Sequence, residues 1–355
     1  MLLDPIKVGA MTLKNRTIMA PLTRCRAGLE HQPNAMMAEY YSQRASAGLL
    51  ITECTMVMEN TSAFATEPGI YSDQQIEGWK LTTDAVHKAG GKIFMQIWHA
   101  GRAAHPDLNN GVESVSASAI AIDGEIHTPN GMVPNATPRA LRDDEIPGIV
   151  EAFAQAAKNA IAAGFDGVEV HAANGYLIDQ FLRESANQRS APYGGSMENR
   201  ARFLFEVLNA VTVAIGSERV GVRLSPLNSF NSMKDSDPVG LVTYLATRLN
   251  EMNLAYLHMM RSDFFGQQEA DVMTAARENY QGILIANMGY NAEEAEQAIA
   301  EGKADTIAFG TGFLANPDLP ERIAKGIEWN APDQSTFYTP GPEGYTDYPT
   351  FTGIK

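Results

Sequence analysis

Eight short apolar runs, most of them followed by a longer stretch with helical patterning, constrain the fold of this chain more than any other feature. The runs are continuously apolar rather than alternating, which is typical of parallel strands buried on both faces. The predicted strands are residues 16–20, 48–53, 92–98, 165–170, 219–224, 254–259, 282–287 and 305–310. Eight strand–helix units predict an α/β fold, a (β/α)8 TIM barrel with right-handed crossovers, as one domain over residues 1–355.

The helical segments carry recognisable end signals. Residues 143–164 begin with acidic residues, continue with an Ala-rich apolar stripe and reach Gly164 where a C-terminal cap belongs. Residues 196–216 and 291–305 repeat the scheme, because each begins with Ser or Asn and ends near a glycine.

Two segments interrupt the alternation. Residues 6–16 alternate and turn at Gly9, which predicts a β-hairpin that closes the bottom of the barrel. Residues 102–140 are rich in Pro, Gly, Asn and Ser and lie between the third strand and its helix. A connection of this length in a compact domain is usually functional, so we expect it to form a lid or an excursion near the site.

Composition excludes several classes of function. No run approaches the ~18 apolar residues of a membrane span, and Lys7, Lys14 and Arg16 break the N-terminal apolar stretches, which argues against a signal peptide. A net charge of −15 opposes nucleic-acid binding. Cys25 and Cys54 are too few for a disulfide framework and favour the cytoplasm. No predicted helix has a face whose sequence pattern indicates a subunit interface, so we expect a monomer or a weak homo-oligomer.

In such a barrel, functional side chains gather at the carboxyl ends of the strands and in the loops that follow. The polar and aromatic residues at these ends are Thr23, Gln96, Trp98, His99, His171, Asn174, Tyr176 and Arg223. Taken alone, each residue also has a purely structural explanation, such as a hydroxyl that stabilises a turn or a buried amide whose hydrogen bonds are made within the protein. The segment "VEVHAANGYLIDQF" (168–181) fits either a capped helix start or a pocket that holds one oxygen atom and delivers a proton. Convergence on one rim favours the pocket.

The last two strands end in glycines directly before predicted helix starts, in "NMGY" (287–290) and "FGTG" (309–312). Barrels commonly bind a phosphate at this position through backbone N–H groups. Tight strand–helix turns also use glycine, so both explanations stand on these residues alone. Arg223 adds a fixed cation suited to an anionic or electron-rich ring edge.

Signatures of other chemistries are missing from the sequence. The seven histidines form no HExxH motif or Cys/His cluster, so no metal site is predicted. No GxSxG elbow and no Walker-type loop occurs. Lys92 opens the third strand at the wrong end of the barrel for a Schiff-base lysine, which weakens an aldolase hypothesis.

Six segments together resemble the Old Yellow Enzyme family of FMN-dependent ene-reductases, in the right order and across essentially the whole chain. They are "APLTR" (20–24), "FMQIWHAGR" (94–102), "HAANGYLIDQFLRESANQRSAPYGGSMENRARF" (171–203), "VRLSP" (222–226), "FLANPDLP" (313–320) and "FYTPGPEGYTDYP" (337–349). The block from 171 to 202 is the most specific. Thr23, rather than a cysteine, follows "APL", which resembles the classical branch of the family.

The resemblance implies a reaction and three catalytic residues. NADPH or NADH would reduce non-covalently bound FMN, which would then pass a hydride from N5 to the β-carbon of an activated alkene in a ping-pong cycle. Small electrophilic alkenes such as α,β-unsaturated carbonyls and maleimides, with nitro compounds as a further class, would be the substrates. His171 and Asn174 would donate hydrogen bonds to the substrate oxygen, and Tyr176 would supply the α-proton.

The resemblance also implies which residues surround FMN and the substrate. Thr23 would bond the flavin O4 edge, Gln96 the pyrimidine edge, and Arg223 would face N1 and O2. The implied FMN contacts are Pro21, Leu22, Thr23, Cys54, Gln96, Arg223, Met288, Gly289, Phe309, Gly310 and Thr311. The implied substrate pocket is formed by Phe64, Trp98, Asn231, Phe264 and Tyr338, with the C-terminal tail (331–355) over the active-site side.

Three positions depart from what is usual in the family. Thr311 stands where relatives usually carry an arginine on the FMN phosphate, so a charge-assisted contact worth roughly 1.5–3 kcal/mol is missing. Weaker FMN retention follows unless another cation compensates. Phe64 replaces a frequent Tyr, which makes the pocket slightly more apolar. Asn174 replaces the His of some members, and both side chains donate hydrogen bonds.

Two other functional classes compete with this hypothesis. A flavin-free barrel lyase or isomerase would use the glycine-rich ends for a sugar phosphate and Tyr176 or His171 as a proton shuttle. A non-catalytic barrel would have lost its cofactor, with Thr311 as the sign of that loss. Trimethylamine-dehydrogenase-like relatives need further domains and cluster-binding cysteines that this chain lacks.

Overall fold

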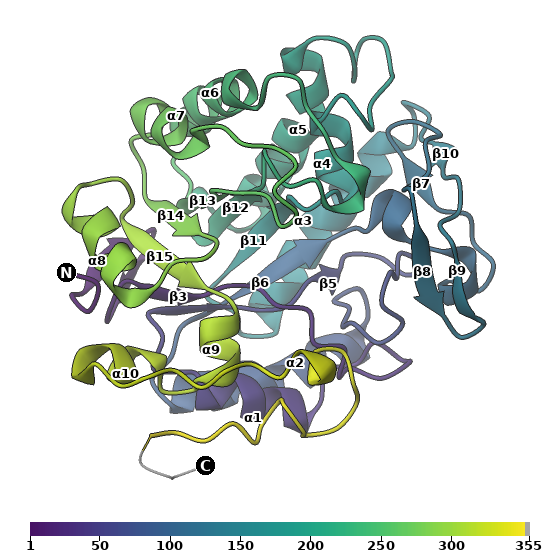
Figure 1. Ribbon diagram of the computed structural model, residues 1–355. Coiled ribbons are helices and arrows are strands. Elements are labelled where there is room, and N and C mark those ends of the chain that lie inside the picture. Colours follow the sequence, from purple (N-terminus) through teal and green to yellow (C-terminus); the bar gives the residue numbers. More distant parts are fainter. Residues whose placement is uncertain (352–355) are drawn as a thin grey trace.

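A computed structural model describes residues 1–351, and a closed barrel of eight parallel strands forms its centre (Figure 1). In order around the barrel these are β3 (Thr17–Met19), β4 (Leu49–Ile51), β6 (Ile93–Trp98), β11 (Gly167–Ala172), β12 (Val220–Leu224), β13 (Tyr256–Met260), β14 (Leu284–Asn287) and β15 (Thr306–Phe309). β15 pairs with β3 to close the circle, and β5 (Thr55–Met56) adds a short parallel pairing to β6. All eight predicted strands and the fold class are confirmed.

Helices cover the outside of the barrel (Figure 1). They are α1 (Ala35–Gln43), α2 (Asp73–Lys88), α3 (Ile146–Ala162), α4 (Leu177–Leu182), α5 (Met197–Ile215), α6 (Pro238–Leu249), α7 (Val272–Asn279), α8 (Ala292–Ala300), α9 (Thr311–Ala315) and α10 (Leu319–Lys325). The predicted end signals are present. Ser196 caps α5 by accepting from Asn199 N, Asn291 caps α8 by accepting from Glu294 N, and Gly164 takes a φ of +91° just after α3. Across residues 1–351 no helix is long and apolar enough to cross a bilayer.

Two apolar layers stabilise the barrel. One lies between the strands and the surrounding helices and includes Trp79, Phe153 and Phe203. The other fills the barrel interior, where Phe94 of β6 packs with Tyr256 of β13. The predicted hairpin, β1 (Ile6–Val8) with β2 (Met11–Leu13), is antiparallel and contributes Val8 and Leu13 to this inner layer. The amino end of the barrel is therefore plugged, and its carboxyl end is left for a site.

The excursion after β6 carries short strands of its own, which its composition did not reveal. β8 (Glu125–Thr128) and β9 (Gly131–Pro134) form an antiparallel hairpin, and β7 (Val115–Ser116) pairs in parallel with β10 (Arg139–Ala140). These strands stand together at one edge of the molecule (Figure 1). The excursion thus presents defined side chains to the carboxyl end of the barrel.

The C-terminal segment is held at the same end by two buried arginines that follow β3. Arg26 donates from Nη1 to the carbonyl of Phe337 (2.8 Å) and from Nη2 to that of Thr336 (2.9 Å), and Arg24 donates from Nη2 to the carbonyl of Gly344 (2.6 Å). The loop that follows β3 thereby fixes the segment that carries Tyr338. Residues 352–355 of the predicted tail lie outside the described range.

Candidate active site

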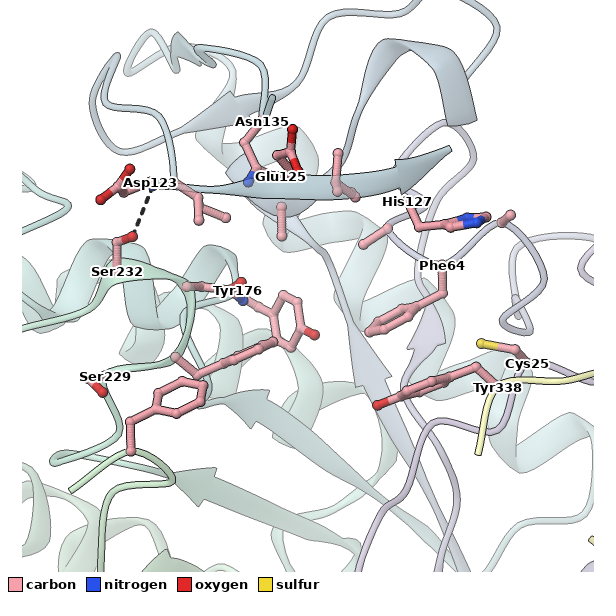
Figure 2. A pocket seen from close by; sticks show the side chains of 18 of the residues that line it. Cys25, Phe64, Asp123, Glu125, His127, Asn135, Tyr176, Ser229, Ser232 and Tyr338 are labelled. Carbon is pink, nitrogen blue, oxygen red and sulfur yellow. Dashed lines mark hydrogen bonds between the residues drawn. The ribbon is translucent and has the colours of Figure 1, made fainter. Parts of the chain in front are cut away.

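A cavity of about 1040 Å³ opens at the carboxyl end of the barrel (Figure 2). Its walls come from the loops after β3, β5, β11, β12 and β13, from the excursion and from the C-terminal segment. Figure 2 shows the Tyr176 ring directed into this space, with Phe64 and Tyr338 on the opposite wall and β8 passing above. The cavity lies where a barrel enzyme places its chemistry.

The backbone between β11 and α4 is held in one conformation by its neighbours. Asn174 and Gly175 both have positive φ angles, +57° and +73°, and a Cβ at Gly175 would lie 2.6 Å from Asn231 Cβ. Gly175 N donates to Asp179 Oδ2 (2.8 Å), and Asn174 N donates to Ser225 Oγ (2.7 Å). Tyr176 occupies the N-cap position of α4, but its side chain makes no capping bond. The segment is a helix start that places Tyr176 on the cavity wall, whereas His171 and Asn174 are not among the residues that line the cavity.

The amide of Asn174 has a defined orientation. Its Oδ1 accepts from Asn228 Nδ2 (2.9 Å), and Asn228 Oδ1 in turn accepts from the backbone N–H of Phe264 (3.3 Å). Because a backbone N–H can only donate, the order of donors and acceptors along this chain is fixed. The NH₂ group of Asn174 is therefore the donor end of the amide, and it has no hydrogen-bond partner in residues 1–351.

His171 and Tyr176 are held in their neutral forms by burial. Burial lowers the pKa of His171 well below its ordinary value, and Arg223 and His258 lower it further. Its Nδ1 is buried and has no hydrogen-bond partner in residues 1–351. Burial raises the pKa of Tyr176 well above 10, so the phenol keeps its proton. The two rings meet edge-on with centroids 5.2 Å apart, which places a neutral imidazole beside a protonated phenol.

Polar groups lie at or after the carboxyl ends of several strands, and we call them the floor of the site. Arg223 of β12 is paired in register with His171 of β11, and its Nη2 donates to Asn287 Oδ1 (2.7 Å). Its Nε is buried without a partner in the described part of the chain. Thr23 Oγ1 lies 3.1 Å from Cys54 Sγ. This floor offers unpaired donors and a cation to a polar ring edge.

A second cavity, of about 150 Å³, lies at the carboxyl ends of β14 and β15. Its lining consists of Gly289, Tyr290, Ala308, Phe309, Gly310, Thr311, Gly312, Trp329, Asn330 and Pro332, none of which is charged. Met288 and Gly289 have positive φ angles of +96° and +69°. A Cβ at Gly310 would touch only Leu22, at 3.4 Å. Backbone groups and the Thr311 hydroxyl are therefore open to a phosphate-sized ligand.

The hydrogen-bonding groups of the floor and of the small cavity together fit FMN. The orphaned guanidinium N–H of Arg223 and the amide of Gln96 suit the carbonyls and N–H of a flavin pyrimidine ring. The small cavity at β14 and β15 suits the phosphate, because it contains no carboxylate that would repel it.

Comparison with known proteins identifies the family. The family described as NADH:flavin oxidoreductase / NADH oxidase matches residues 1–330. The chain belongs to this family. A probable flavin mononucleotide-dependent alkene reductase from Leishmania infantum is 52% identical over 355 residues, which cover 98% of this chain and 97% of that protein.

Solved structures agree with this assignment. The old yellow enzyme from Trypanosoma cruzi superposes with a TM-score of 0.96 at 47% identity, covering 99% of this chain and 98% of that one. Morphinone reductase in complex with tetrahydroNAD superposes with a TM-score of 0.94 at 44% identity, covering 99% and 97%. This flavin oxidoreductase is an Old Yellow Enzyme-type, FMN-dependent ene-reductase with a nicotinamide nucleotide as reductant, which excludes the flavin-free and non-catalytic alternatives.

In this oxidoreductase, most of the residues predicted for the substrate pocket lie together in the structure. Phe64, Asn231 and Tyr338 line the large cavity, and Phe64 stacks on Tyr338 with centroids 5.8 Å apart. Trp98 is fully buried behind the wall and meets the Tyr176 ring edge-on at 5.1 Å. Phe264 lies outside the lining and packs against Phe230, whereas its neighbour Phe265 lines the cavity.

Sequence reasoning missed several residues that line the cavity of the oxidoreductase. Cys25, which the sequence did not mark as a pocket residue, lines the cavity from the loop after β3, where its φ is +59°. Burial raises its pKa above the ordinary thiol range, so it remains a thiol. Asp123, Glu125 and His127 reach the cavity from β8 and the residues before it (Figure 2). The sequence of the excursion contains no pattern that indicates which of its side chains face the cavity.

Proposed function

We propose that His171 and Asn174 hold the carbonyl, imide or nitro oxygen of an activated alkene, and that Tyr176 donates the proton to its α-carbon. The observation that carries this proposal is the Asn228–Asn174 bond, because it leaves the Asn174 NH₂ group free to donate, and His171 on the same segment is neutral. Two neutral donors stabilise negative charge that develops on the substrate oxygen. Tyr176 stays protonated up to high pH, as an acid must.

We propose that Thr23, Gln96 and Arg223 hold the flavin ring, and that Gly289, Gly310 and Thr311 hold its phosphate. Pro21, Leu22, Cys54, Met288 and Phe309 complete this proposed set. When bound, FMN supplies the hydride that the alkene accepts at its β-carbon. The chain's own residues orient the two partners and exclude water, since Tyr338 borders the cavity opposite Tyr176 and β8 passes above it (Figure 2).

The dimensions of the cavity support α,β-unsaturated carbonyls and maleimides as substrates, including bulky ones. A volume of about 1040 Å³ exceeds what a small enone needs, and Phe64 with Tyr338 supplies an aromatic wall. Asp123 and Glu125 make the β8 side of the rim acidic, which disfavours substrates with a carboxylate there. Lys234 provides a permanent cation on the lining, and on that basis we keep NADPH beside NADH as a reductant.

Product analysis tests the proposed function. Purified holoenzyme, given NADPH or NADH under anaerobic conditions, should convert 2-cyclohexenone and N-ethylmaleimide to the saturated ketone and succinimide in stoichiometric amounts. Oxidation of the nucleotide without a saturated product would contradict the proposed roles of the three residues.

Replacing Thr311 with arginine should slow the release of FMN by roughly tenfold, because the neutral phosphate cavity would gain a charge-assisted contact. A charge-assisted contact can contribute about 1.5–3 kcal/mol, but we do not expect the full value here. Residue 311 is exposed, and solvent screens the new charge. Arg261, the cation beside Gly289, does not compensate, because both of its Nη atoms donate to the Glu294 carboxylate. The measurement is the recovery of free flavin fluorescence after dilution.

The matched control is Thr311→Gln, which adds length and hydrogen-bonding capacity without charge. An unchanged release rate in Thr311→Arg, or an equal change in both variants, would show that charge at this cavity is not what limits FMN retention.

We further propose a cytoplasmic location, one FMN-binding domain over residues 1–355, and a monomer or weak homo-oligomer. Both cysteines are free and buried, which suits a reducing compartment. The net charge of −15 argues against nucleic acid as a partner. Sedimentation of the holoenzyme over a range of concentrations tests the oligomeric state.

A further inference from the structure

A buried carboxylate lies in the barrel below the proposed flavin site. Glu169 of β11 is two residues before His171, so both side chains point to the same face of the strand. Glu169 is fully buried. Its Oε1 accepts from Gln96 Nε2 (2.8 Å), and its Oε2 lies 2.8 Å from His258 Nδ1. The carboxylate therefore touches one of the proposed flavin contacts directly.

The arrangement joins strands that are not neighbours. β12 separates β11 from β13, and its residue in register with Glu169 is Gly221. A Cβ at Gly221 would lie 2.2 Å from the Tyr256 ring, so only glycine leaves β13 room to pack across β12. His258, two residues after Tyr256 on β13, thereby reaches the Glu169 carboxylate. The absence of a side chain at 221 is part of this pairing.

The protonation states of Glu169 and His258 follow from their burial and from the groups that they contact. Burial raises the pKa of Glu169, but His258, Arg223 and Gln96 outweigh it and the pKa is lowered, so the carboxylate is ionised. Burial lowers the pKa of His258 despite Glu169, so this imidazole is neutral and donates its Nδ1 proton to the carboxylate. Its Nε2 is then an acceptor, and it has no partner in the described residues. The negative charge of Glu169 thus faces the positive charge of Arg223.

The carboxylate also sets the direction of the Gln96 amide. A carboxylate can only accept, so the NH₂ end of Gln96 must point down to Glu169 and the Oε1 end away from it. Gln96 Oε1 makes no hydrogen bond to any residue from 1 to 351 in the structure. It is left as an acceptor for a ligand N–H, such as that of a flavin pyrimidine ring.

We propose that Glu169 is a positioning residue for FMN, which fixes the Gln96 amide and offsets the Arg223 charge, and so lowers the two-electron midpoint potential of the bound flavin. The inference rests on the proposed placement of Gln96 and Arg223 at the pyrimidine ring. Reduction adds negative charge at that ring, and a nearby buried anion opposes it. A lower potential makes the reduced cofactor a stronger hydride donor to the alkene.

Glu169→Gln tests the charge while it keeps the shape. The new amide can accept from Gln96 and donate to His258 Nδ1, because a neutral imidazole can change its tautomer. We expect the midpoint potential to rise by about 30 mV or more, the equivalent of a tenfold gain in affinity for reduced over oxidised FMN. Affinity for oxidised FMN, measured by quenching of flavin fluorescence on apoprotein, should change much less. An unchanged potential would overturn the proposal.

Two further variants make the outcome specific. Asp166→Asn removes a carboxylate just before β11 at the opposite end of the barrel, where it binds Ile93 N, and should not move the potential. An equal shift there would also overturn the proposal. If Glu169→Gln does not fold, Glu169→Leu with His258→Leu removes the carboxylate together with its imidazole partner. This double variant leaves the Arg223 charge without its counterpart and should raise the potential in the same way.

Gln96→Leu separates this inference from the function on which it rests. It should weaken FMN binding if Gln96 holds the flavin. Weakened binding in Gln96→Leu with no shift in Glu169→Gln would overturn the role of Glu169 alone. Unchanged FMN affinity and potential in Gln96→Leu would overturn the placement of the flavin, and the inference with it.

Discussion

Replacing Tyr176 with phenylalanine should slow alkene reduction by roughly 10²–10⁴-fold, the usual contribution of a positioned acid, while the nucleotide still reduces the flavin at its normal rate. The hydroxyl is the only part removed, and the ring contacts with Trp98 and His171 remain. Rapid-mixing measurement of the two half-reactions separates the steps. Reduction by the nucleotide requires no proton from Tyr176, so only re-oxidation by the alkene should be slow.

The control for Tyr176→Phe is an acceptor that needs no proton donor. Re-oxidation of the reduced enzyme by ferricyanide should be as fast in the variant as in the wild type. If re-oxidation by 2-cyclohexenone is equally fast in both proteins, the α-proton does not come from Tyr176.

Replacing Asn174 with aspartate should reduce alkene turnover by roughly 10²–10³-fold, because a hydrogen-bond donor to the developing oxyanion becomes a carboxylate. The substitution is well matched to the structure. Aspartate tolerates the φ of +57° at this position and still accepts from Asn228 Nδ2 through its retained oxygen. The loss should appear in kcat/KM for the alkene and in the rate of re-oxidation, with flavin reduction much less affected.

Asn174→His is the matched control, since histidine also tolerates a positive φ and offers a nitrogen donor. It should retain most of the activity. Equal losses in the aspartate and histidine variants would mean that the backbone conformation matters at residue 174 and the donor does not.

The fold could be predicted because its signal is local. Eight buried parallel strands need eight continuous apolar runs, and Gly164, Ser196 and Asn291 mark helix ends through bonds within a few residues. The barrel end that holds the site follows from the strand direction alone. This is why His171 and Arg223, which lie side by side in the β11–β12 register, were both selected from the sequence.

The missed features depend on contacts between distant segments. Glu169 and His258 are 89 residues apart and meet across an intervening strand on which Gly221 leaves room for the Tyr256 ring. The choice of Phe265 over Phe264 depends on a loop whose backbone is bound to Asp263 and Asn228. Loops have no periodicity from which the orientation of a side chain can be inferred, so these positions are evident only in the folded structure.

In the proposed reaction, one cavity brings a hydride donor and the Tyr176 proton to adjacent carbons of the same alkene. The most direct measurement is the position of deuterium in the product when holoenzyme reduces 2-cyclohexenone with unlabelled nucleotide in heavy water. The phenol proton exchanges with solvent, so we predict deuterium at the α-carbon and ordinary hydrogen at the β-carbon. Deuterium at the β-carbon, or an unlabelled α-carbon, would contradict this account.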